Sequence, residues 1–189
     1  FTPADRGLIS VHIEKESERR THLGAFAKLT TMVDGRPRID EDPPIRVTID
    51  DDEQDALTDQ LLAGYRMTLQ EDRRHLFDRF TPVDLVRQVV GVGSVGMRVY
   101  LSLLEGRSGN DPLFLQIKEA RASVLEPYAG KSLHKNHGQR VIAGQRLMQS
   151  ASDVFLGWTR GQSGRDVYVR QLRDMKMSAI IEDMNTPLL

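Results

Sequence analysis

The chain has 189 residues, which fits one domain or one large domain with a small appendage. Its residues are 39% hydrophobic and 28% charged, as in a protein with a real core, and 26 Lys and Arg against 27 Asp and Glu leave a formal charge of −1. This balance argues against a nucleic-acid partner, and the lack of cysteine excludes disulfides and thiolate metal sites. No apolar run approaches the roughly 18–20 residues of a membrane span, so we expect no membrane partner and a cytoplasmic location.

The first predicted elements are a helix and two short extended pieces. An amphipathic pattern over residues 10–33 predicts a helix that is ended by Asp34 and Gly35. Residues 36–39 and 45–49 are expected to be extended. Alternation in the second piece turns three side chains inward: Ile45, Val47 and Ile49.

Two further helices are predicted before residue 83. The acidic run 50–52 suits the N-cap of a helix over residues 53–69. The buried stripe of this helix has four-residue spacing: Leu57, Leu61, Tyr65 and Leu69. A shorter helix is expected over residues 72–80, ending before Pro82 because proline has no N–H for a helix interior.

From residue 83 the pattern changes to that of strands. Residues 83–120 are strand-rich and are interrupted by loops at 91–96 and 106–112. The elements that follow are a short helix, a longer helix and a hairpin, expected over residues 123–128, 137–151, 154–158 and 167–172. The order α, then β-β-β-α-β-β, predicts an α+β fold with a mostly antiparallel sheet and flanking helices.

These elements suggest a division of the chain into three parts. Residues 1–82 are expected to form a helical N-terminal segment with two short strands. Residues 83–177 form the strand-rich unit, and residues 178–189 begin a further element. Because the sequence starts at Phe1 without an initiating Met, we expect an excerpt of a longer protein.

A glycine-rich segment separates the first two strands of the strand-rich unit. Gly91, Gly93 and Gly96 form a Gly-x-Gly-x-x-Gly pattern, whose bare backbone N–H groups can approach phosphate oxygens, and the Ser94 hydroxyl adds a donor. After Gly96 the apolar residues alternate as in a strand, whereas a dinucleotide-binding fingerprint requires a helix there. A glycine loop between antiparallel strands is typical of the kinase-type lobe that covers nucleotide phosphates, although a bulged hairpin also explains three glycines.

Lys118 interrupts the next apolar strand. A lysine in such a strand costs desolvation unless an anion pairs with it, and the alternative is an edge-strand lysine that reaches solvent. A kinase-type lobe pairs this lysine with a carboxylate on the following helix, but residues 137–149 contain none. The remaining candidates are Glu126, which precedes that helix, and Gln139, which could orient the amine without neutralising it. Glu119 alternates onto the other side of the strand.

Other polar side chains have simpler explanations than catalysis. His134 and His137 have the spacing of a metal-binding pair but suit surface or helix-capping roles better. Four basic side chains of the C-terminal hairpin could steer a polyphosphate or form a solvated strand face: Arg165, Arg170, Arg173 and Lys176. The sequence provides no candidate catalytic residue and no candidate metal ligand.

Several of these stretches resemble a bacterial family known as domain of unknown function two-two-five-two. They include Val89-Val-Gly-Val-Gly-Ser-Val-Gly96, Leu115-Gln-Ile-Lys-Glu-Ala120, Ser123-Val-Leu-Glu-Pro-Tyr128, and residues 35–39, 42–44, 140–149, 152–158 and 168–176. The resemblance spans most of residues 21–178. It implies a longer protein with upstream motifs similar to the catalytic and metal-binding segments of aminoglycoside-kinase-like enzymes. Because those motifs precede the glycine loop, the resemblance implies a permuted kinase order. Neither motif occurs in this chain.

The sequence also departs from the pattern that the resemblance implies. Arg98 stands where a kinase-type loop has valine, with Val99 one place late. Other family members tend to have an acidic residue near Gln139, so this chain lacks that partner for the lysine. These departures leave open a lobe that binds a nucleotide without catalysis.

Our leading hypothesis is therefore a kinase-like N-terminal lobe that binds ATP with magnesium. The amides of residues 91–96 would hold the β- and γ-phosphates, and Lys118 would contact the α- or β-phosphate. A hinge-like segment would lie near the adenine: Leu172, Arg173 and Asp174. Nucleotide and the remainder of its own longer chain are the expected partners, and we expect no chemistry from this chain alone. The alternative is a non-catalytic binding or scaffold module.

Overall fold

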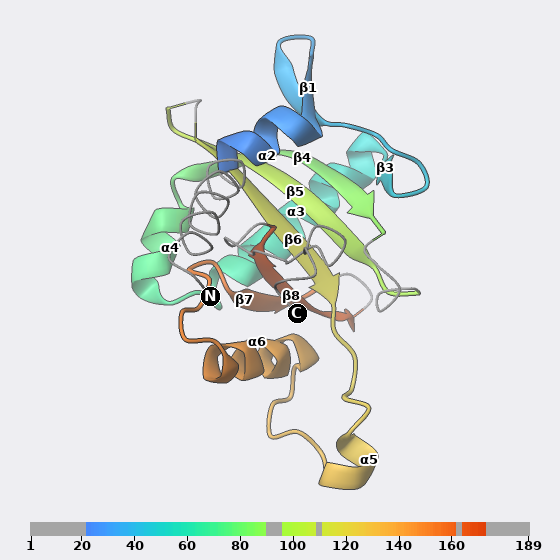
Figure 1. The fold of residues 1–189 in the computed structure, drawn as a ribbon, viewed down its shortest axis with the longest axis vertical. Helices are drawn as coiled ribbons and strands as arrows, with labels where there is room; N and C mark the ends of the chain where they lie inside the picture. The colour runs from blue at the N-terminus through green and yellow to red at the C-terminus, as the bar shows by residue number, and fades with distance from the viewer. Residues whose placement is uncertain (1–21, 90–95, 109–110, 162–163, 173–189) are drawn as a thin grey trace, which may run out of the picture.

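Six strands form one antiparallel sheet in the computed structural model, which describes residues 22–89, 96–108, 111–161 and 164–172. The strands are β3 (Arg46–Thr48), β4 (Phe80–Gln88), β5 (Val99–Gly106), β6 (Pro112–Glu119), β7 (Gly157–Arg160) and β8 (Asp166–Gln171). Their order across the sheet is β3-β4-β5-β6-β8-β7, and all neighbouring pairs are antiparallel (Figure 1). β5 and β6 therefore lie at the centre, and β3 and β7 form the edges.

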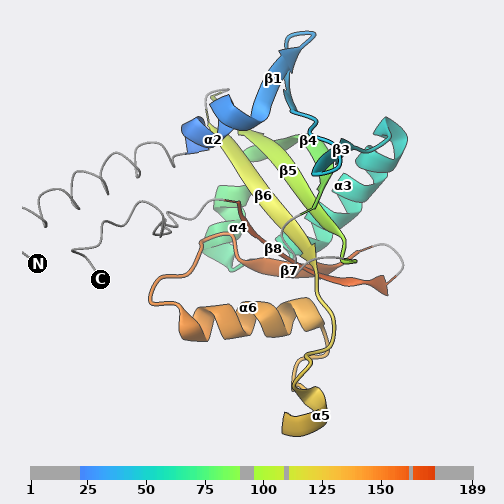
Figure 2. The same ribbon diagram turned by 45° about the vertical axis from the view of Figure 1, so that its right-hand side comes forward.

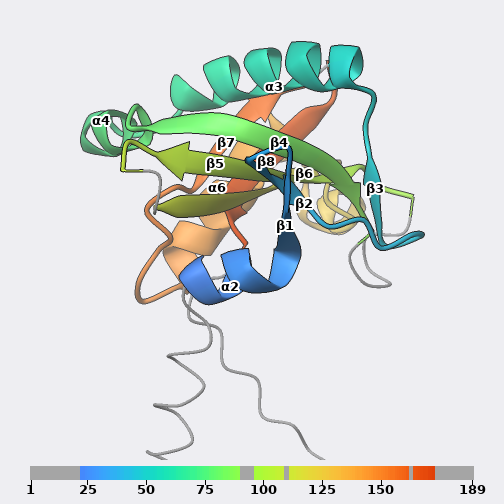
Figure 3. The same ribbon diagram turned by 90° about the horizontal axis from the view of Figure 1, so that it is seen from above.

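Helices cover both faces of this sheet. α3 (Asp51–Arg66) crosses one face, which we call the α3 face, whereas α2 (His22–Leu29) and α6 (His137–Met148) lie on the other, the α6 face (Figure 3). The remaining elements are two short helices and a separate hairpin: α4 (Glu71–Phe77), α5 (Glu126–Ala129), β1 (Thr30–Val33) and β2 (Arg36–Ile39). The predicted α+β class, with an antiparallel sheet and flanking helices, is confirmed.

The larger core lies between α3 and the sheet. Leu115 and Ile117 alternate along β6 onto the α3 face and are completely buried. They belong to one cluster with Tyr65 of α3, whose hydroxyl donates a 2.6 Å hydrogen bond to the carbonyl of Phe155. Burial raises the pKa of Tyr65 well above its usual value, so the phenol stays neutral. The four-residue spacing predicted for this helix is confirmed by its buried side chains Leu57, Leu61 and Tyr65. Leu69 is also buried but lies beyond the end of α3 at Arg66.

A second, smaller core occupies one end of the α6 face. Its members come from α2, β2, β4, β5 and β6: Ala25, Leu29, Ile39, Val86, Leu101, Leu103 and Phe114. Asp84 of β4 joins β2 to the sheet, because one carboxylate oxygen accepts the backbone N–H of Ile39 at 2.7 Å and the other accepts Arg38 at 3.1 Å. The elements before residue 83 therefore share their cores with the strands that follow.

Replacing Asp84 by asparagine should destabilise the fold by about 1–2 kcal/mol. The Asp84 side chain is only 3% exposed, and asparagine offers one acceptor where the carboxylate serves both the Ile39 N–H and Arg38. Denaturant unfolding measures the change, with Asp59→Asn on the exposed surface of α3 as the matched control. Equal stability of the two variants would contradict the role given to Asp84.

The prediction of a single helix up to residue 33 is wrong. α2 ends at Leu29, and the next four residues form β1. Three of those four residues are β-branched, which favours a strand over a helix. Asp34 and Gly35, with φ of 50° and 76°, form the turn of the β1–β2 hairpin and do not end a helix.

The inward orientation predicted for Ile45 and Val47 is also wrong. Their exposures are 48% and 43%, whereas Ile49 is buried as predicted. β3 is a three-residue edge strand that pairs only with β4, so it has sheet on one side alone. The hydrophobic alternation shows an extended conformation here but does not determine how much of it is covered.

Several helix ends differ from the sequence prediction. α3 ends at Arg66, three residues earlier than predicted. α4 ends at Phe77, and Phe80 already begins β4. Pro82 lies inside that strand, where the register with β5 shifts, a position that tolerates proline. α6 ends at Met148, three residues earlier than predicted. Within the described ranges, no helix is long and apolar enough to cross a membrane.

Candidate functional site

The connection between β4 and β5 contains the glycine-rich segment. Gly91, Gly93 and Ser94 lie outside the described residues, whereas Gly96 is described and has a φ of 76°, which favours glycine. The chain leaves Gly96 through a turn and enters β5 at Val99. The strand predicted after Gly96 is therefore confirmed, and the helix that a dinucleotide-binding fingerprint requires at this point is excluded.

Lys118 lies directly beside the strand that follows the glycine segment. On β6 it pairs with Val99 of β5 on one side and with Tyr168 of β8 on the other. β6 is a central strand, so the alternative of an edge-strand lysine is wrong. Of the eight residues of β6, Lys118 is partly exposed and the other seven are buried. The described part of the chain thus places a half-buried cation next to the end of the glycine segment.

A second cation shares the α6 face with Lys118. Gln116, two residues before Lys118, accepts a 3.3 Å hydrogen bond from Arg170 of β8. The Nε of Arg170 is buried and has no hydrogen-bond partner among the described residues. Burial raises the pKa of Tyr168, an effect that the charge of Arg170 partly opposes, so the phenol there is neutral at pH 7. The face offers donors and positive charge, which suit an anion.

Leu172 follows β8 on the same face, at its far end from Lys118. Its backbone N–H donates to the carbonyl of Phe114 at 3.0 Å, and its side chain packs against the smaller core. It lies four residues beyond Tyr168, which corresponds to about 13 Å along a strand. Arg173 and Asp174, the other hinge-like candidates, lie outside the described residues.

The two candidate partners of Lys118 occupy different places. Glu126 lies on α5, which projects away from the sheet (Figure 2), and its carboxylate accepts the backbone N–H of Ser123 at 3.4 Å. Gln139 lies in the first turn of α6, where its backbone N–H donates to the N-cap side chain of Asn136. Further along α6, Gln145 lines a cavity of about 40 Å³ together with Arg170 and Leu172.

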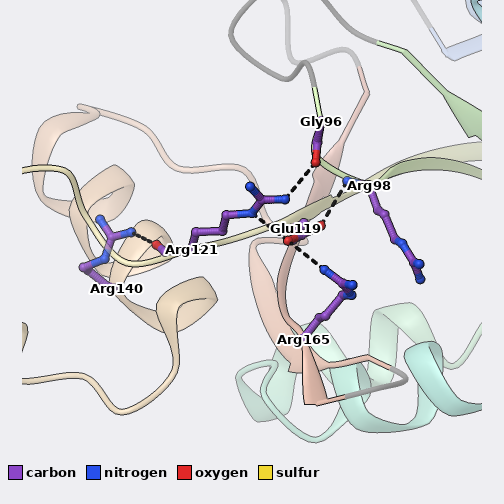
Figure 4. A network of polar contacts seen from close by, with 6 residues as sticks. All are labelled: Gly96, Arg98, Glu119, Arg121, Arg140 and Arg165. Atoms are coloured by element: carbon purple, nitrogen blue, oxygen red, sulfur yellow. Dashed lines mark hydrogen bonds and ion pairs between the residues drawn. The ribbon is translucent and has the colours of Figure 1, made fainter.

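Glu119 organises a network that the sequence did not predict (Figure 4). One carboxylate oxygen accepts hydrogen bonds from the side chains of Arg121 at 2.8 Å and Arg165 at 3.3 Å. The other oxygen accepts a hydrogen bond from the backbone N–H of Arg98 at 3.1 Å. Arg121 also donates to the carbonyl of Gly96 at 2.7 Å. The end of the glycine segment is therefore attached to the end of β6 through a buried carboxylate.

The charge of Glu119 is stabilised by these contacts. Burial by itself raises the pKa of the carboxyl, but hydrogen bonds from Arg121 and the Arg98 N–H, with the charges of Arg121 and Arg165, lower the pKa overall. The signal available in the sequence was an acidic residue at the end of an apolar strand with Arg121 two positions later. It could not reveal Arg165, which is 46 residues away.

The chain is therefore an α+β protein in which Lys118 and Arg170 lie on one face of an antiparallel sheet. Among the described residues, no group of three or more His, Asp or Glu side chains could hold a metal ion. The chain belongs to the family described as "Uncharacterized protein conserved in bacteria" (DUF2252), whose model matches residues 3–189. No curated protein and no solved structure gives a significant match. The family resemblance inferred from the sequence is confirmed.

Proposed function

We propose that this chain is the lobe of a phosphotransferase that binds the phosphates of ATP with magnesium, the acceptor substrate being unknown. The observation that carries the proposal is the position of Lys118, half-buried on a central strand beside Val99, three residues after Gly96. A lysine in this environment is stabilised by an anion, and the adjacent glycine segment offers backbone N–H groups to the same anion.

The arrangement of elements supports a kinase-like lobe. The glycine segment joins the antiparallel strands β4 and β5, Lys118 lies on the third strand β6, and α6 then leads to the β7–β8 hairpin. β8 returns to lie next to β6, so the strand that precedes Leu172 runs beside the strand of Lys118. Glycine loop, lysine strand, helix and hairpin follow in the order expected of such a lobe.

Each residue has a separate role in this proposal. Amides of residues 91–96 hold the β- and γ-phosphates, Lys118 contacts the α- or β-phosphate, and Arg170 adds positive charge on the same face. The segment 172–174 lies near the adenine. Magnesium accompanies the nucleotide and reduces the charge of its phosphates. We propose no phosphoryl transfer by this chain alone, because that reaction requires a base and metal ligands, for which the sequence offers no candidate.

A non-catalytic binding module is the second candidate, and one observation favours it. The arm of residues 121–136 that carries α5 projects from the body (Figures 1 and 2) and exposes large apolar side chains. Leu133 is fully exposed, and the others are 62–88% exposed: Val124, Leu125 and Tyr128. Exposed apolar surface of this kind is typical of a protein–protein contact, for which the remainder of the longer chain is the proposed partner.

Magnesium-ATP should stabilise the chain, and Lys118→Ala should abolish that effect. Ligand at one hundred times its Kd adds about 2.7 kcal/mol, a Tm increase of roughly 5–10 °C for a chain of this length. Thermal unfolding with and without magnesium-ATP measures it, with AMP and NAD as ligand controls and Lys131→Ala as the exposed control variant. An unchanged Tm with ATP, together with a Lys118→Ala variant that is clearly less stable without ligand, would contradict the proposal and favour the binding module.

A further inference from the structure

A cationic groove lies at the end of β6. It has a volume of about 440 Å³ and is lined by residues from the end of β6, the start of α6 and the β7–β8 hairpin. Five basic side chains contribute to it: Arg121, Lys135, His137, Arg160 and Arg165. Glu119 is one of the lining residues and Lys118 is not. The two are neighbours on β6, so their side chains lie on opposite faces of the sheet. The groove is therefore separate from the site proposed for ATP.

The acidic side chains of the groove are already satisfied by the protein. Glu119 is held by Arg121, Arg165 and the Arg98 N–H, as described above. Asp166 is buried and accepts the side-chain amide of Asn136 and the backbone N–H of His137, both at 2.8 Å. The four Arg and Lys charges exceed the two carboxylate charges, so the lining carries a positive excess.

The arginines of the groove retain donors for a ligand. Arg121, Arg160 and Arg165 are 56%, 60% and 42% exposed. Among the described residues, Arg160 donates to the Asp166 carboxylate through Nε, and Arg165 donates to the Glu119 carboxylate through Nη1. A guanidinium has five N–H donors, so most of those on Arg160 and Arg165 can face an anion in the groove. The carboxylates behind them fix the positions of the guanidinium groups without neutralising the whole lining.

We propose that this groove binds an oligophosphate, a small ligand with at least two phosphoryl groups. Arginine forks match the oxygens of phosphate groups, and several cations around one cavity favour a multiply charged ligand over a monoanion. A volume of about 440 Å³ is in the range of small-molecule sites. The net charge of −1 for the whole chain argues against a long nucleic acid as the ligand.

Binding in the groove would act on the glycine segment through Arg121. The guanidinium of Arg121 contacts both Glu119 and the carbonyl of Gly96, so it links the groove lining to the last glycine (Figure 4). An oligophosphate that draws Arg121 toward the groove weakens its hold on Gly96. The proposal itself does not depend on ATP binding at Lys118, because the two sites use different side chains.

Isothermal titration with inorganic tripolyphosphate at low salt tests the groove. The double variant Lys135→Gln/Arg160→Gln should bind tripolyphosphate at least tenfold more weakly than the natural chain. The single variant Lys135→Gln, which removes no ion pair among the described residues, should bind it several-fold more weakly. The matched control is Lys131→Gln/Arg107→Gln, which removes two exposed charges outside the groove. Lys118→Ala should leave this affinity unchanged, which separates the groove from the ATP site.

Two further conditions define the expected result. Sulfate should bind at least tenfold more weakly than tripolyphosphate, and raising the salt concentration should weaken tripolyphosphate binding, because the groove charges are partly exposed. Absence of binding at millimolar tripolyphosphate would overturn the proposal. The proposal would also be overturned if the double variant and its control bound tripolyphosphate equally well, or if sulfate bound as tightly as tripolyphosphate. A loss of tripolyphosphate binding in Lys118→Ala alone would overturn it as well.

Discussion

Replacing Gly138 by alanine is expected to destabilise the folded chain by about 3 kcal/mol. Gly138 lies in the first turn of α6, where a Cβ would be 2.7 Å from the carbonyl carbon of Val167 on β8 and closer still to its oxygen. The obstacle is the backbone of β8, which is paired with β6 on one side and β7 on the other, so it cannot turn away as a side chain could. Overpacking against a fixed neighbour costs up to about 3 kcal/mol and sometimes more.

Gly144→Ala on the same helix is the matched control. No atom lies within 4 Å of the position that its Cβ would occupy, and alanine is the better helix former by roughly 1 kcal/mol. Denaturant unfolding should therefore show opposite effects for two chemically identical substitutions six residues apart. If both variants were equally stable, the close packing of α6 against β8 would be wrong.

Replacing Glu119 by alanine is expected to lower the free energy of unfolding by about 3 kcal/mol. The side chain is only 5% exposed and supports a backbone N–H and two arginines, and losing one partner of a buried ion pair costs about 3–5 kcal/mol. The lower end applies because Arg121 and Arg165 are half-exposed and water can solvate them. Glu105→Ala, on the neighbouring strand β5, is the control and should change stability by roughly 0.5 kcal/mol or less.

The contribution of Glu119 to the stability of the folded chain should depend on pH in the acid range. The pKa of its carboxyl is lowered in the folded state from an ordinary value of 4.5, so the charged form is favoured by folding. A lowered pKa gives stability that is fully present above the ordinary value and is lost as pH falls through the folded-state pKa. The stability difference between the natural chain and Glu119→Ala should be constant near pH 7 and should narrow below pH 4.5. A difference that widened on acidification would contradict this sign.

The sequence predicted the elements whose pattern is local. The stripe of Leu57, Leu61 and Tyr65 required only helical spacing, and the strand after Gly96 required only alternation. The β1 strand was missed because an amphipathic stripe continued through four residues, three of which have β-branched side chains that favour a strand. The exposure of β3 depends on its place at the sheet edge, which spacing within a segment does not reveal.

The candidate site shows the same division between local and distant information. Lys118 could be singled out because a lysine breaks an apolar run, but its central position followed only from the pairing of β6 with β5 and β8. The network of Glu119 joins Arg98, Arg121 and Arg165, which come from three separate parts of the chain. Pairing between such distant residues is a property of the assembled sheet, so the groove could not be predicted from the sequence.

The most direct test of the proposed phosphate site is an amide NMR titration of ¹⁵N-labelled chain with magnesium-ATP. We predict saturable shifts for the amides of residues 90–99 and Lys118, with Lys135 and Gly164 in the cationic groove unaffected at stoichiometric ligand. In Lys118→Ala the same shifts should appear only at much higher ligand concentration. Absence of shifts, or shifts confined to Lys135, Arg160 and Gly164, would contradict a nucleotide site at the glycine segment.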